Sequence, residues 1–315
     1  MELPVMASEP IERLRRNITS VYMGNTAAVD RVILCLLARG HILIEDVPGV
    51  GKTVLANALA KSVRCSFTRI QCTPDLLPSD IIGVSVYDRE QGVFEFKRGP
   101  IFHSIILADE INRTTPRTQS ALLEAMNEAT VSVESQVFQL PQPFMVVATQ
   151  NPYEFEGTYF LPENQLDRFL MRINLGYPAP DDESRIIEKQ PARTTLATLE
   201  PVMSSEEVLR LQEQVDEVSI DQTLVDYVIA LAAATRENDD LQIGISPRGS
   251  LALAQAARAC AMMQGRDYCV PEDIVSNVLA VCAHRVISKT YMHAGDTATT
   301  KRIIQQVLET VPSPA

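Results

Sequence analysis

The stretch that decides the fold is Glu45-Asp46-Val47-Pro48-Gly49-Val50-Gly51-Lys52-Thr53. A short apolar run at residues 41–44 precedes it, and a segment of helical character, residues 54–61, follows. Strand, tight loop and helix in this order form the context of a phosphate-binding loop. Glycine lets the backbone approach a phosphate closely, and the N–H groups at the start of the helix can then hold the anion.

The loop predicts a site for a nucleotide and a metal ion. Lys52 is expected to reach the β- and γ-phosphates, and the Thr53 hydroxyl to ligate Mg²⁺. The strict pattern G-x-x-x-x-G-K-[ST] has glycine where this chain has Asp46. Aspartate tolerates unusual backbone angles, so the turn can form if the carboxylate points away from the phosphates. An ordinary turn before a helix is the alternative. The predicted contacts of the loop are Asp46, Val47, Pro48, Gly49, Val50, Gly51, Lys52, Thr53 and Val54.

The composition is that of a soluble globular protein, with 46% apolar and 22% charged residues. The 315 residues allow one large domain or two modest ones. The apolar stretch at residues 32–38 is far too short to span a membrane. Six cysteines without a C-x-x-C pair argue against zinc and disulfides, and predict a cytoplasmic location. The net charge of −12 is opposite to that of a dedicated duplex-DNA binder, which makes nucleic acid the weaker expectation.

Polar side chains follow two apolar runs that read as strands. Residues 104–108 lead into Asp109 and Glu110, and residues 144–150 lead into Asn151. Ligands of open α/β sheets bind at the carboxyl ends of strands. Asp109 is expected to hold Mg²⁺ through water, and Glu110 to orient and activate the attacking water. Asn151 is placed to contact a γ-phosphate or its water. Solvated surface acids are the alternative interpretation of Asp109 and Glu110.

Two β-hairpins are predicted in this half, at residues 84–97 and 130–140, because apolar and polar residues alternate there on both sides of turn residues. The composition changes around residues 177–182, which predicts a domain boundary after residue 178. The remainder shows no strand pattern and is expected to be all-α. The predicted helices are 182–190, one that opens with a capping box at Ser204, 221–236, 247–264, 271–288 and 300–310.

Ser246-Pro247-Arg248 marks a helix start with an unusual charge. Ser caps and Pro opens the helix, but Arg248 in the first turn opposes the helix dipole. This favours an anionic partner, such as a γ-phosphate across a domain cleft. A solvent-exposed arginine is the alternative.

Together these segments resemble the MoxR family of AAA+ ATPases over about residues 10–310. The phrases that carry the resemblance are LIEDVPGVGKT (43–53), LADEINRT (107–114), TQNP (149–152), LPENQLDRF (161–169) and SPR (246–248). The resemblance implies an α/β fold, namely a P-loop AAA+ parallel sheet domain with helices on both faces at residues 1–178. A smaller all-α lid domain at residues 179–315 follows. The hairpins would be the family's helix-2 insert and presensor-1 hairpin.

The same resemblance implies roles for single residues. Lys52 and Thr53 match Walker A, Asp109 and Glu110 match Walker B, and Asn151 matches sensor 1. Arg248 matches sensor 2, and Arg168 matches an arginine finger that acts on the ATP of a neighbouring subunit. Gly24 lies where the family's G-Q motif contacts adenine, although Asn25 replaces the glutamine. Arg113 and Arg117 are further candidates for contacts with a neighbour's phosphates.

By family resemblance, the chain uses ATP and Mg²⁺, hydrolyses ATP and forms a homo-oligomeric ring, by analogy a hexamer. Members are thought to be chaperones that activate partner proteins or load metal into them, often with von Willebrand A-type partners. Three alternatives remain open. One is a magnesium-chelatase ATPase subunit. Another is a nucleic-acid motor, disfavoured because the tip at 88–92 is of mixed charge and Glu134-Ser135 is acidic. The third is a non-hydrolysing switch, against which Glu110, Arg168 and Arg248 count.

Overall fold

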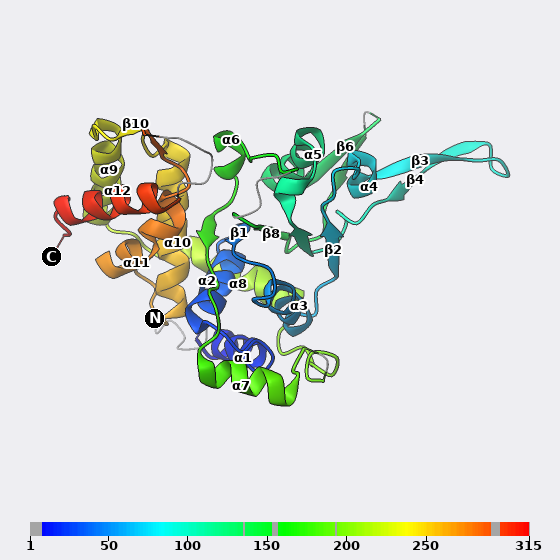
Figure 1. Ribbon diagram of the computed structural model, residues 1–315, viewed down its shortest axis with the longest axis horizontal. Helices are drawn as coiled ribbons and strands as arrows, with labels where there is room; N and C mark the ends of the chain where they lie inside the picture. The colour runs from blue at the N-terminus through cyan, green and yellow to red at the C-terminus, as the bar shows by residue number, and fades with distance from the viewer. Residues whose placement is uncertain (1–7, 135, 153–156, 193, 291–296, 315) are drawn as a thin grey trace.

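A parallel five-stranded sheet lies at the centre of the sequence's first half (Figure 1). The computed structural model describes residues 8–134, 136–152, 157–192, 194–290 and 297–314, so Ser135 at the predicted acidic tip lies outside the described residues. The strand order is β2-β5-β8-β1-β9, and each neighbouring pair is parallel. The strands are β1 (Ile42–Glu45), β2 (Phe67–Gln71), β5 (Ile105–Asp109), β8 (Met145–Gln150) and β9 (Met171–Ile173).

The three central strands, β5, β8 and β1, are almost entirely buried because both faces of the sheet are covered, as is usual for parallel sheets, whereas the edge strand β2 carries the exposed polar residues Arg69 and Gln71. Within β5, Ile105 and Leu107 belong to one buried core, and Ile106 and Ala108 belong to the other. The first core includes residues of α1 (Ser8–Thr19), α2 (Thr26–Leu37) and α3 (Lys52–Ser62). The second includes residues of α4 (Pro78–Ile82) and α5 (Pro116–Glu128). The predicted α/β architecture, with helices on both faces of the sheet, is confirmed.

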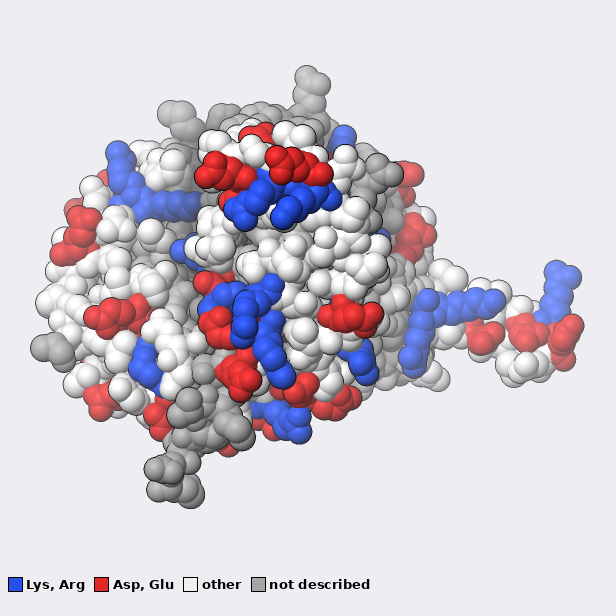
Figure 2. Space-filling view, turned by 90° about the horizontal axis from the view of Figure 1, so that it is seen from below, with Lys and Arg blue, Asp and Glu red and all other residues white. Residues whose placement is uncertain are grey.

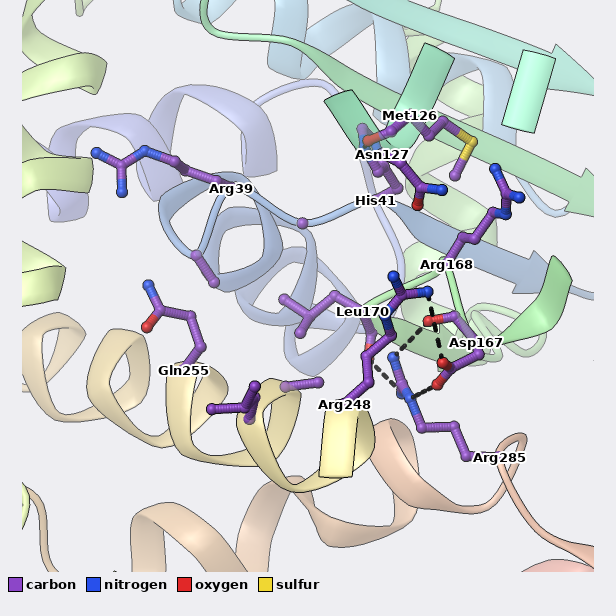
Figure 3. A pocket seen from close by; sticks show the side chains of 14 residues that line it. Arg39, His41, Met126, Asn127, Asp167, Arg168, Leu170, Arg248, Gln255 and Arg285 are labelled. Atoms are coloured by element: carbon purple, nitrogen blue, oxygen red, sulfur yellow. Dashed lines mark hydrogen bonds and ion pairs between the residues drawn. The ribbon is translucent and has the colours of Figure 1, made fainter. Parts of the chain in front are cut away.

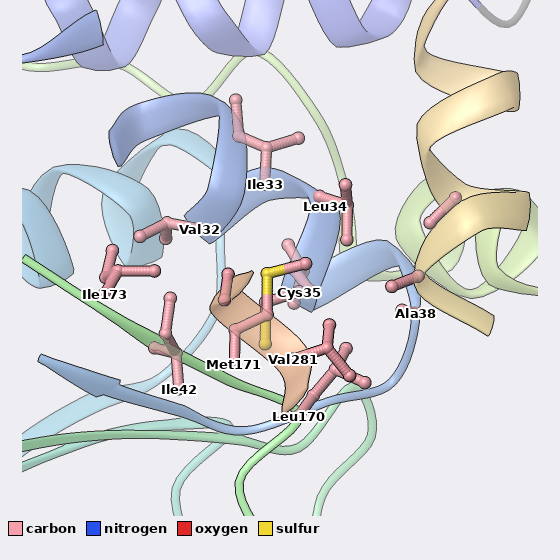
Figure 4. Close-up of a cluster of buried hydrophobic side chains, with 14 of the residues drawn as sticks. Val32, Ile33, Leu34, Cys35, Ala38, Ile42, Leu170, Met171, Ile173 and Val281 are labelled. Carbon is pink, nitrogen blue, oxygen red and sulfur yellow. The ribbon is translucent and has the colours of Figure 1, made fainter. Parts of the chain in front are cut away.

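The first core also joins the sheet to the C-terminal helices. Figure 4 shows Cys35 of α2 among Met171 of β9, Ile42 of β1 and Val281 of α11 (Pro271–Cys282). All four side chains have an exposed fraction of 1% or less. The sheet and the helical part therefore share one apolar core. Burial of a large apolar side chain in it contributes about 1.5–3 kcal/mol to the stability of the fold.

Both predicted hairpins are present, as β3 (Gly83–Asp88) with β4 (Val93–Arg98), and β6 (Thr130–Val133) with β7 (Gln136–Gln139). The β3–β4 hairpin projects away from the body of the molecule (Figure 1). At its base, the backbone around Gly83 lies directly against the backbone around Gly99. A Cβ at Gly83, whose φ is +113°, would lie 2.2 Å from the Lys97 oxygen, and one at Gly99 would lie 2.3 Å from the Ile81 oxygen. Only glycine fits at both positions.

The second half is mainly helical, but the expectation that it is all-α was wrong. Strands β10 (Leu241–Ile243) and β11 (Ile287–Ser288) form a small antiparallel pair. The helix predicted at residues 271–288 ends at Cys282, because the buried side chains of His284 and Arg285 turn to bond the backbone at Phe169. The helices not yet given are α6 (Glu163–Leu166), α7 (Pro180–Lys189), α8 (Ser205–Glu217), α9 (Gln222–Glu237), α10 (Pro247–Met263), α12 (Thr297–Thr310) and the short 3-10 turn η1 (Ile111–Arg113).

The predicted helix starts are confirmed where the cap was read from sequence. Ser204 and Glu207 form the expected capping box, and the Ser246 hydroxyl accepts the Gly249 N–H at 3.1 Å. In the described part of the chain, no helix combines the length and apolar character needed to cross a bilayer.

Candidate functional site

The loop between β1 and α3 has the backbone that its glycines predict. Gly49 and Gly51 have φ values of +91° and +92°, in the left-handed region that favours glycine. Helix α3 begins at Lys52, whose side chain is largely buried and whose Nζ donates a hydrogen bond to the Asp46 carbonyl oxygen at 2.7 Å. The lysine is therefore folded over the loop, where an anion held by the loop would meet it.

Asp46, the departure from the strict pattern, anchors the loop. Its Oδ2 accepts the N–H groups of Leu175 at 2.8 Å and Gly176 at 2.7 Å, and its Oδ1 accepts the N–H of Val47 at 2.9 Å. The carboxylate points away from the space enclosed by the loop, as the sequence required. Asp46 and Val47 support the loop from outside that space.

A cavity of about 350 Å³, called the loop cavity below, collects most of the predicted residues. Its lining comes from three strand ends and the loop: Pro48, Gly49, Gly51, Lys52, Thr53, Val54, Arg69, Gln71, Asp109, Glu110 and Asn151. The sheet order explains this meeting, since β5 lies between β2 and β8, and β8 lies beside β1. All carboxyl ends of parallel strands open at one edge of the sheet.

Backbone geometry lets both acids line the same cavity. Glu110 has a φ of +58°, which breaks the alternation of strand β5 directly after Asp109. The Thr149 hydroxyl donates to Asp109 Oδ1 at 2.6 Å and accepts the Glu110 N–H at 2.9 Å. Thr149 thus fixes both acids against β8, a role that sequence reasoning had not assigned to it.

Two cations and an amide contact the acids. Arg69 of β2 donates from Nε to Asp109 Oδ2 at 3.1 Å. Arg113 donates to Glu110 Oε2 at 3.0 Å, and the Gln71 amide donates to the same oxygen at 3.3 Å. Arg69 and Gln71 were missed from the sequence, although two long polar side chains spaced by two at the end of a strand could have indicated them. Arg113, expected to reach a neighbour, lies on Glu110 of its own chain, and Arg117 is exposed on α5.

The donor set fits a magnesium nucleotide. The Thr53 hydroxyl and the Asp109 carboxylate supply oxygen ligands, which Mg²⁺ prefers. A side chain at Gly51 would be strained, because its φ is +92° and a Cβ would lie 3.2 Å from the Tyr22 ring. Backbone N–H groups at the start of a helix such as α3 are suited to hold an anion.

A second cavity, of about 380 Å³ and called the Tyr22 cavity below, adjoins the loop. It shares Gly49, Gly51 and Val54 with the loop cavity and has a mainly apolar lining. Burial, with a smaller effect of the Asp46 carboxylate, raises the pKa of Tyr22 to about 12, so the ring stays neutral. Gly24, where the resemblance places an adenine contact, lines this cavity. The Asn25 side chain instead caps α2 by accepting the Ala27 N–H at 3.0 Å.

Arg168 and Arg248 lie in a different cavity, called the arginine cavity below (Figure 3). It has no lining residue in common with the loop cavity. Arg248 is 61% exposed and its nearest carboxylate oxygen, on Asp167, is 3.8 Å away. Arg248 thus lies apart from the loop cavity of its own chain in this conformation, and its contact with a γ-phosphate stays a prediction. Figure 3 shows the Arg248 guanidinium beside Asp167, whereas the Arg168 guanidinium points away from Asp167 and donates a hydrogen bond to the Leu123 carbonyl oxygen of α5.

Buried Arg285 holds the segment that carries Arg168. Its Nε donates to Asp167 Oδ1 at 2.8 Å, and its NH2 group donates to the Phe169 carbonyl oxygen at 2.7 Å. Burial lowers the pKa of Arg285, and the cation remains charged because arginine starts far above neutral pH. Sequence reasoning placed residue 285 in a helix and assigned it no role.

The comparisons with known proteins agree with this geometry. Residues 41–171 match the model of the ATPase family associated with various cellular activities (AAA), and residues 233–307 match the AAA lid domain. A crystal structure of a protein from Cytophaga hutchinsonii matches with a TM-score of 0.89 and 37% identity, over 98% of this chain and 96% of that one.

Two curated relatives identify the family within the AAA ATPases. The chain is 41% identical to Chaperone MoxR1 of Mycobacterium tuberculosis, over 96% of this chain and 82% of the relative. It is 48% identical to YeaC of Bacillus subtilis strain 168, over 86% and 85%. The chain therefore belongs to the MoxR family of AAA ATPases. The magnesium-chelatase subunit ChlI-2 of Arabidopsis thaliana is more distant, at 30% identity over 62% of this chain and 47% of the relative.

Proposed function

We propose that this protein binds Mg²⁺–ATP in the loop and Tyr22 cavities and hydrolyses it. The supporting observation is that one cavity brings together the phosphate loop, both carboxylates and Asn151. ATP contributes the phosphoanhydride bond to be cleaved, and Mg²⁺ neutralises charge on its phosphates. In this proposal the base lies against Tyr22 and Gly24, and the triphosphate lies along the loop.

The chain's own residues divide the work. Lys52 and the N–H groups at the start of α3 bind the phosphates, and Thr53 and Asp109 hold the metal directly or through water. Glu110 accepts a proton from the attacking water, and Asn151 orients that water or the γ-phosphate. Glu110 is contacted by Arg113 and Gln71 in this conformation, so it must turn toward the water to act.

We infer that Arg168 and Arg248 act together on ATP bound by a neighbouring copy. Both line the arginine cavity, away from the loop cavity of their own chain. Among the described residues, the buried Arg168 Nε has no hydrogen-bond partner, whereas NH1 of the same guanidinium donates to the Leu123 carbonyl oxygen; Arg248 is mostly exposed. A guanidinium is suited to the charge that develops on a transferring phosphoryl group. This arrangement requires a ring, and a hexamer is the expected size.

The ring is proposed to remodel partner proteins, and the word chaperone in the name of the relative Chaperone MoxR1 supports this proposal. The β3–β4 hairpin offers a contact for a polypeptide: Tyr87 and Phe94 pack with ring centroids 5.2 Å apart and are 51% and 70% exposed. Activation or metal loading of partners together with a von Willebrand A-type protein remains the family-based proposal. Two further proposals are the domain limits 1–178 and 179–315, and a cytoplasmic location, which six unpaired cysteines support.

The nucleic-acid alternative has less support. The hairpin carries three basic residues, Arg89, Lys97 and Arg98, and three acidic ones, Asp88, Glu90 and Glu95. Figure 2 shows acidic and basic side chains intermingled on the face seen there and along the projecting hairpin. Nucleic-acid motors use basic tracks instead.

A subunit-mixing experiment tests the shared site. Glu110→Gln and Arg168→Ala should each abolish ATP turnover, and an equal mixture should recover roughly a quarter of wild-type activity, because half of the sites are intact and half of their neighbours carry the finger. The control is a mixture of Arg168→Ala with Arg248→Ala. It should stay inactive if one neighbour must supply both arginines. Recovery in this control would assign Arg248 to its own chain, and no recovery in the first mixture would refute the shared site.

Wild-type turnover and native mass should be measured together across protein concentrations. The proposal expects specific activity to rise as rings form. Constant activity from a monomer would refute it. ATP binding without turnover by assembled wild-type rings would favour the non-hydrolysing switch.

A further inference from the structure

In the proposed site, Asp109, the acid expected to hold the metal, forms an ion pair with Arg69 of the same chain. Arg69 contacts Asp109 Oδ2 through two nitrogens, from Nε at 3.1 Å and from NH2 at 2.5 Å. The Asp109 side chain is 13% exposed and that of Arg69 is 47% exposed. Both residues line the loop cavity beside Thr53.

This contact uses the part of Asp109 that a metal ion would need. The other carboxylate oxygen, Oδ1, already accepts the Thr149 hydroxyl at 2.6 Å. The side of Asp109 that remains for Mg²⁺, or for a water of its hydration shell, is therefore the side that Arg69 covers. A guanidinium and a divalent cation on one carboxylate oxygen repel each other strongly, because two positive charges at such distances interact by several kcal/mol at the effective dielectric of a protein surface.

We propose that Arg69 competes with Mg²⁺ for Asp109 and leaves this carboxylate when the magnesium nucleotide binds. The proposal rests on the proposed function, since it concerns the same site. Arg69 has a second partner available: its NH2 group also donates to Gln71 Oε1 at 2.7 Å. The Arg69 side chain is 47% exposed, so solvent borders it and it has space to turn away from Asp109. Arg69 thus neutralises the charge of the Asp109 carboxylate when no magnesium nucleotide is bound, and it raises the Mg²⁺ concentration that nucleotide binding requires.

The test follows nucleotide binding and needs no turnover. A fluorescent ADP analogue at fixed concentration is titrated with Mg²⁺, and the half-saturating Mg²⁺ concentration is compared between wild type and Arg69→Gln. A partly exposed charge pair of this kind predicts a fall of about fivefold in the variant. Arg69→Lys keeps the charge but loses the two-nitrogen contact, and should give a shift of about twofold in the same direction.

Two controls make the test specific. Arg89→Gln removes the same charge from the exposed hairpin turn and should leave the half-saturating concentration unchanged. On an Asp109→Asn background, adding Arg69→Gln should produce no further shift, because the carboxylate for which the cations compete is gone. A fivefold shift on that background would place the effect of Arg69 elsewhere and overturn the proposal.

Other outcomes are equally decisive. An unchanged or increased Mg²⁺ requirement in Arg69→Gln overturns the competition. Weaker analogue binding by the same factor with Mg²⁺ and with a chelator would make Arg69 a phosphate ligand instead. If Arg69→Gln does not fold, as judged by circular dichroism, the Arg69→Lys shift decides. Failure of wild-type protein to bind the analogue at any Mg²⁺ concentration would instead refute the proposed function.

Discussion

Restoring glycine at position 46 should damage this protein, although glycine is what the strict phosphate-loop pattern requires. The backbone at Asp46 does not have the left-handed conformation that would call for glycine. Its carboxylate instead ties the loop to the chain that follows β9, through the N–H groups of Leu175 and Gly176. Asp46→Gly removes this anchor and leaves the Leu175 N–H without its acceptor.

The magnitude follows from the contacts. A hydrogen bond to a charged group contributes about 2 kcal/mol for the N–H of Leu175, and about 1 kcal/mol for that of Gly176, which is exposed. Glycine adds about 1 kcal/mol of backbone entropy lost on folding. The expected loss for Asp46→Gly is therefore about 4 kcal/mol in the free energy of unfolding. Asp46→Asn keeps one acceptor oxygen and should lose about half as much.

Urea denaturation followed by circular dichroism measures these losses, and titration with a fluorescent ADP analogue measures the effect on the site. We expect Asp46→Gly to weaken nucleotide binding about tenfold, the equivalent of about 1.4 kcal/mol, because the loop is no longer held against β9. Stability within about 0.5 kcal/mol of wild type, the range of neutral surface substitutions, would refute the anchoring argument. So would a larger loss in Asp46→Asn than in Asp46→Gly.

Three further predictions concern buried or constrained positions. Burial lowers the pKa of His41 to about 4, and its Nδ1 accepts the Val146 N–H at 3.0 Å. The unfolded chain binds a proton at this histidine below about pH 6.5, whereas the folded chain binds it only below about pH 4, so the free energy of unfolding should decrease by up to about 3 kcal/mol as the pH is lowered from 6.5 to 4. Urea melts across this pH range should show a smaller decrease for His41→Gln. Arg172→Met removes the ion-pair partner that lies 2.6 Å from the Glu45 carboxylate, whose side chain is only 3% exposed, and should lower the free energy of unfolding by about 3–5 kcal/mol. Adding Glu45→Gln should recover most of this loss. A double variant no more stable than Arg172→Met alone would contradict the argument. Gly51→Ala should lower the free energy of unfolding by about 1–2 kcal/mol, because φ at this position is +92°. Its methyl group would also press on the Tyr22 ring beside the loop, so titration with the ADP analogue should show binding at least about tenfold weaker. Unchanged affinity would argue against a close approach of the loop to phosphate.

The features predictable from the sequence are those that local pattern encodes. The loop glycines, the paired acids after an apolar run and the alternation of the β3–β4 hairpin each have a physical cause within about ten residues of chain, and the structure has them at those positions. Their convergence in one cavity follows from a parallel sheet, because its strand ends share one edge. The domain limits and the individual roles of the site residues stay predictions.

What the sequence did not reveal depends on distant contacts. Arg69 belongs to the site only because β2 pairs with β5, which brings its side chain to Asp109. The helix predicted through residue 288 stops at Cys282 because Arg285 is recruited to Phe169, a contact between residues 116 positions apart in the chain. Strands β10 and β11 have three and two residues, too few for a period of two to be recognised. Placing Arg248 likewise required knowing how α10 packs against α2, α8, α9 and α11.

The close backbone contact of Gly83 with Gly99 holds the base of the β3–β4 hairpin rigidly against the body of the molecule. Because neither Gly83 nor Gly99 has space for a side chain, the two strands leave the body locked against each other. Helix α4 directly precedes Gly83, and the chain before α4 is β2, whose last residues line the loop cavity. If a partner protein binds this hairpin as proposed, a force on its tip would therefore act through α4 on the strand that carries Arg69 and Gln71, at the edge of the proposed nucleotide site.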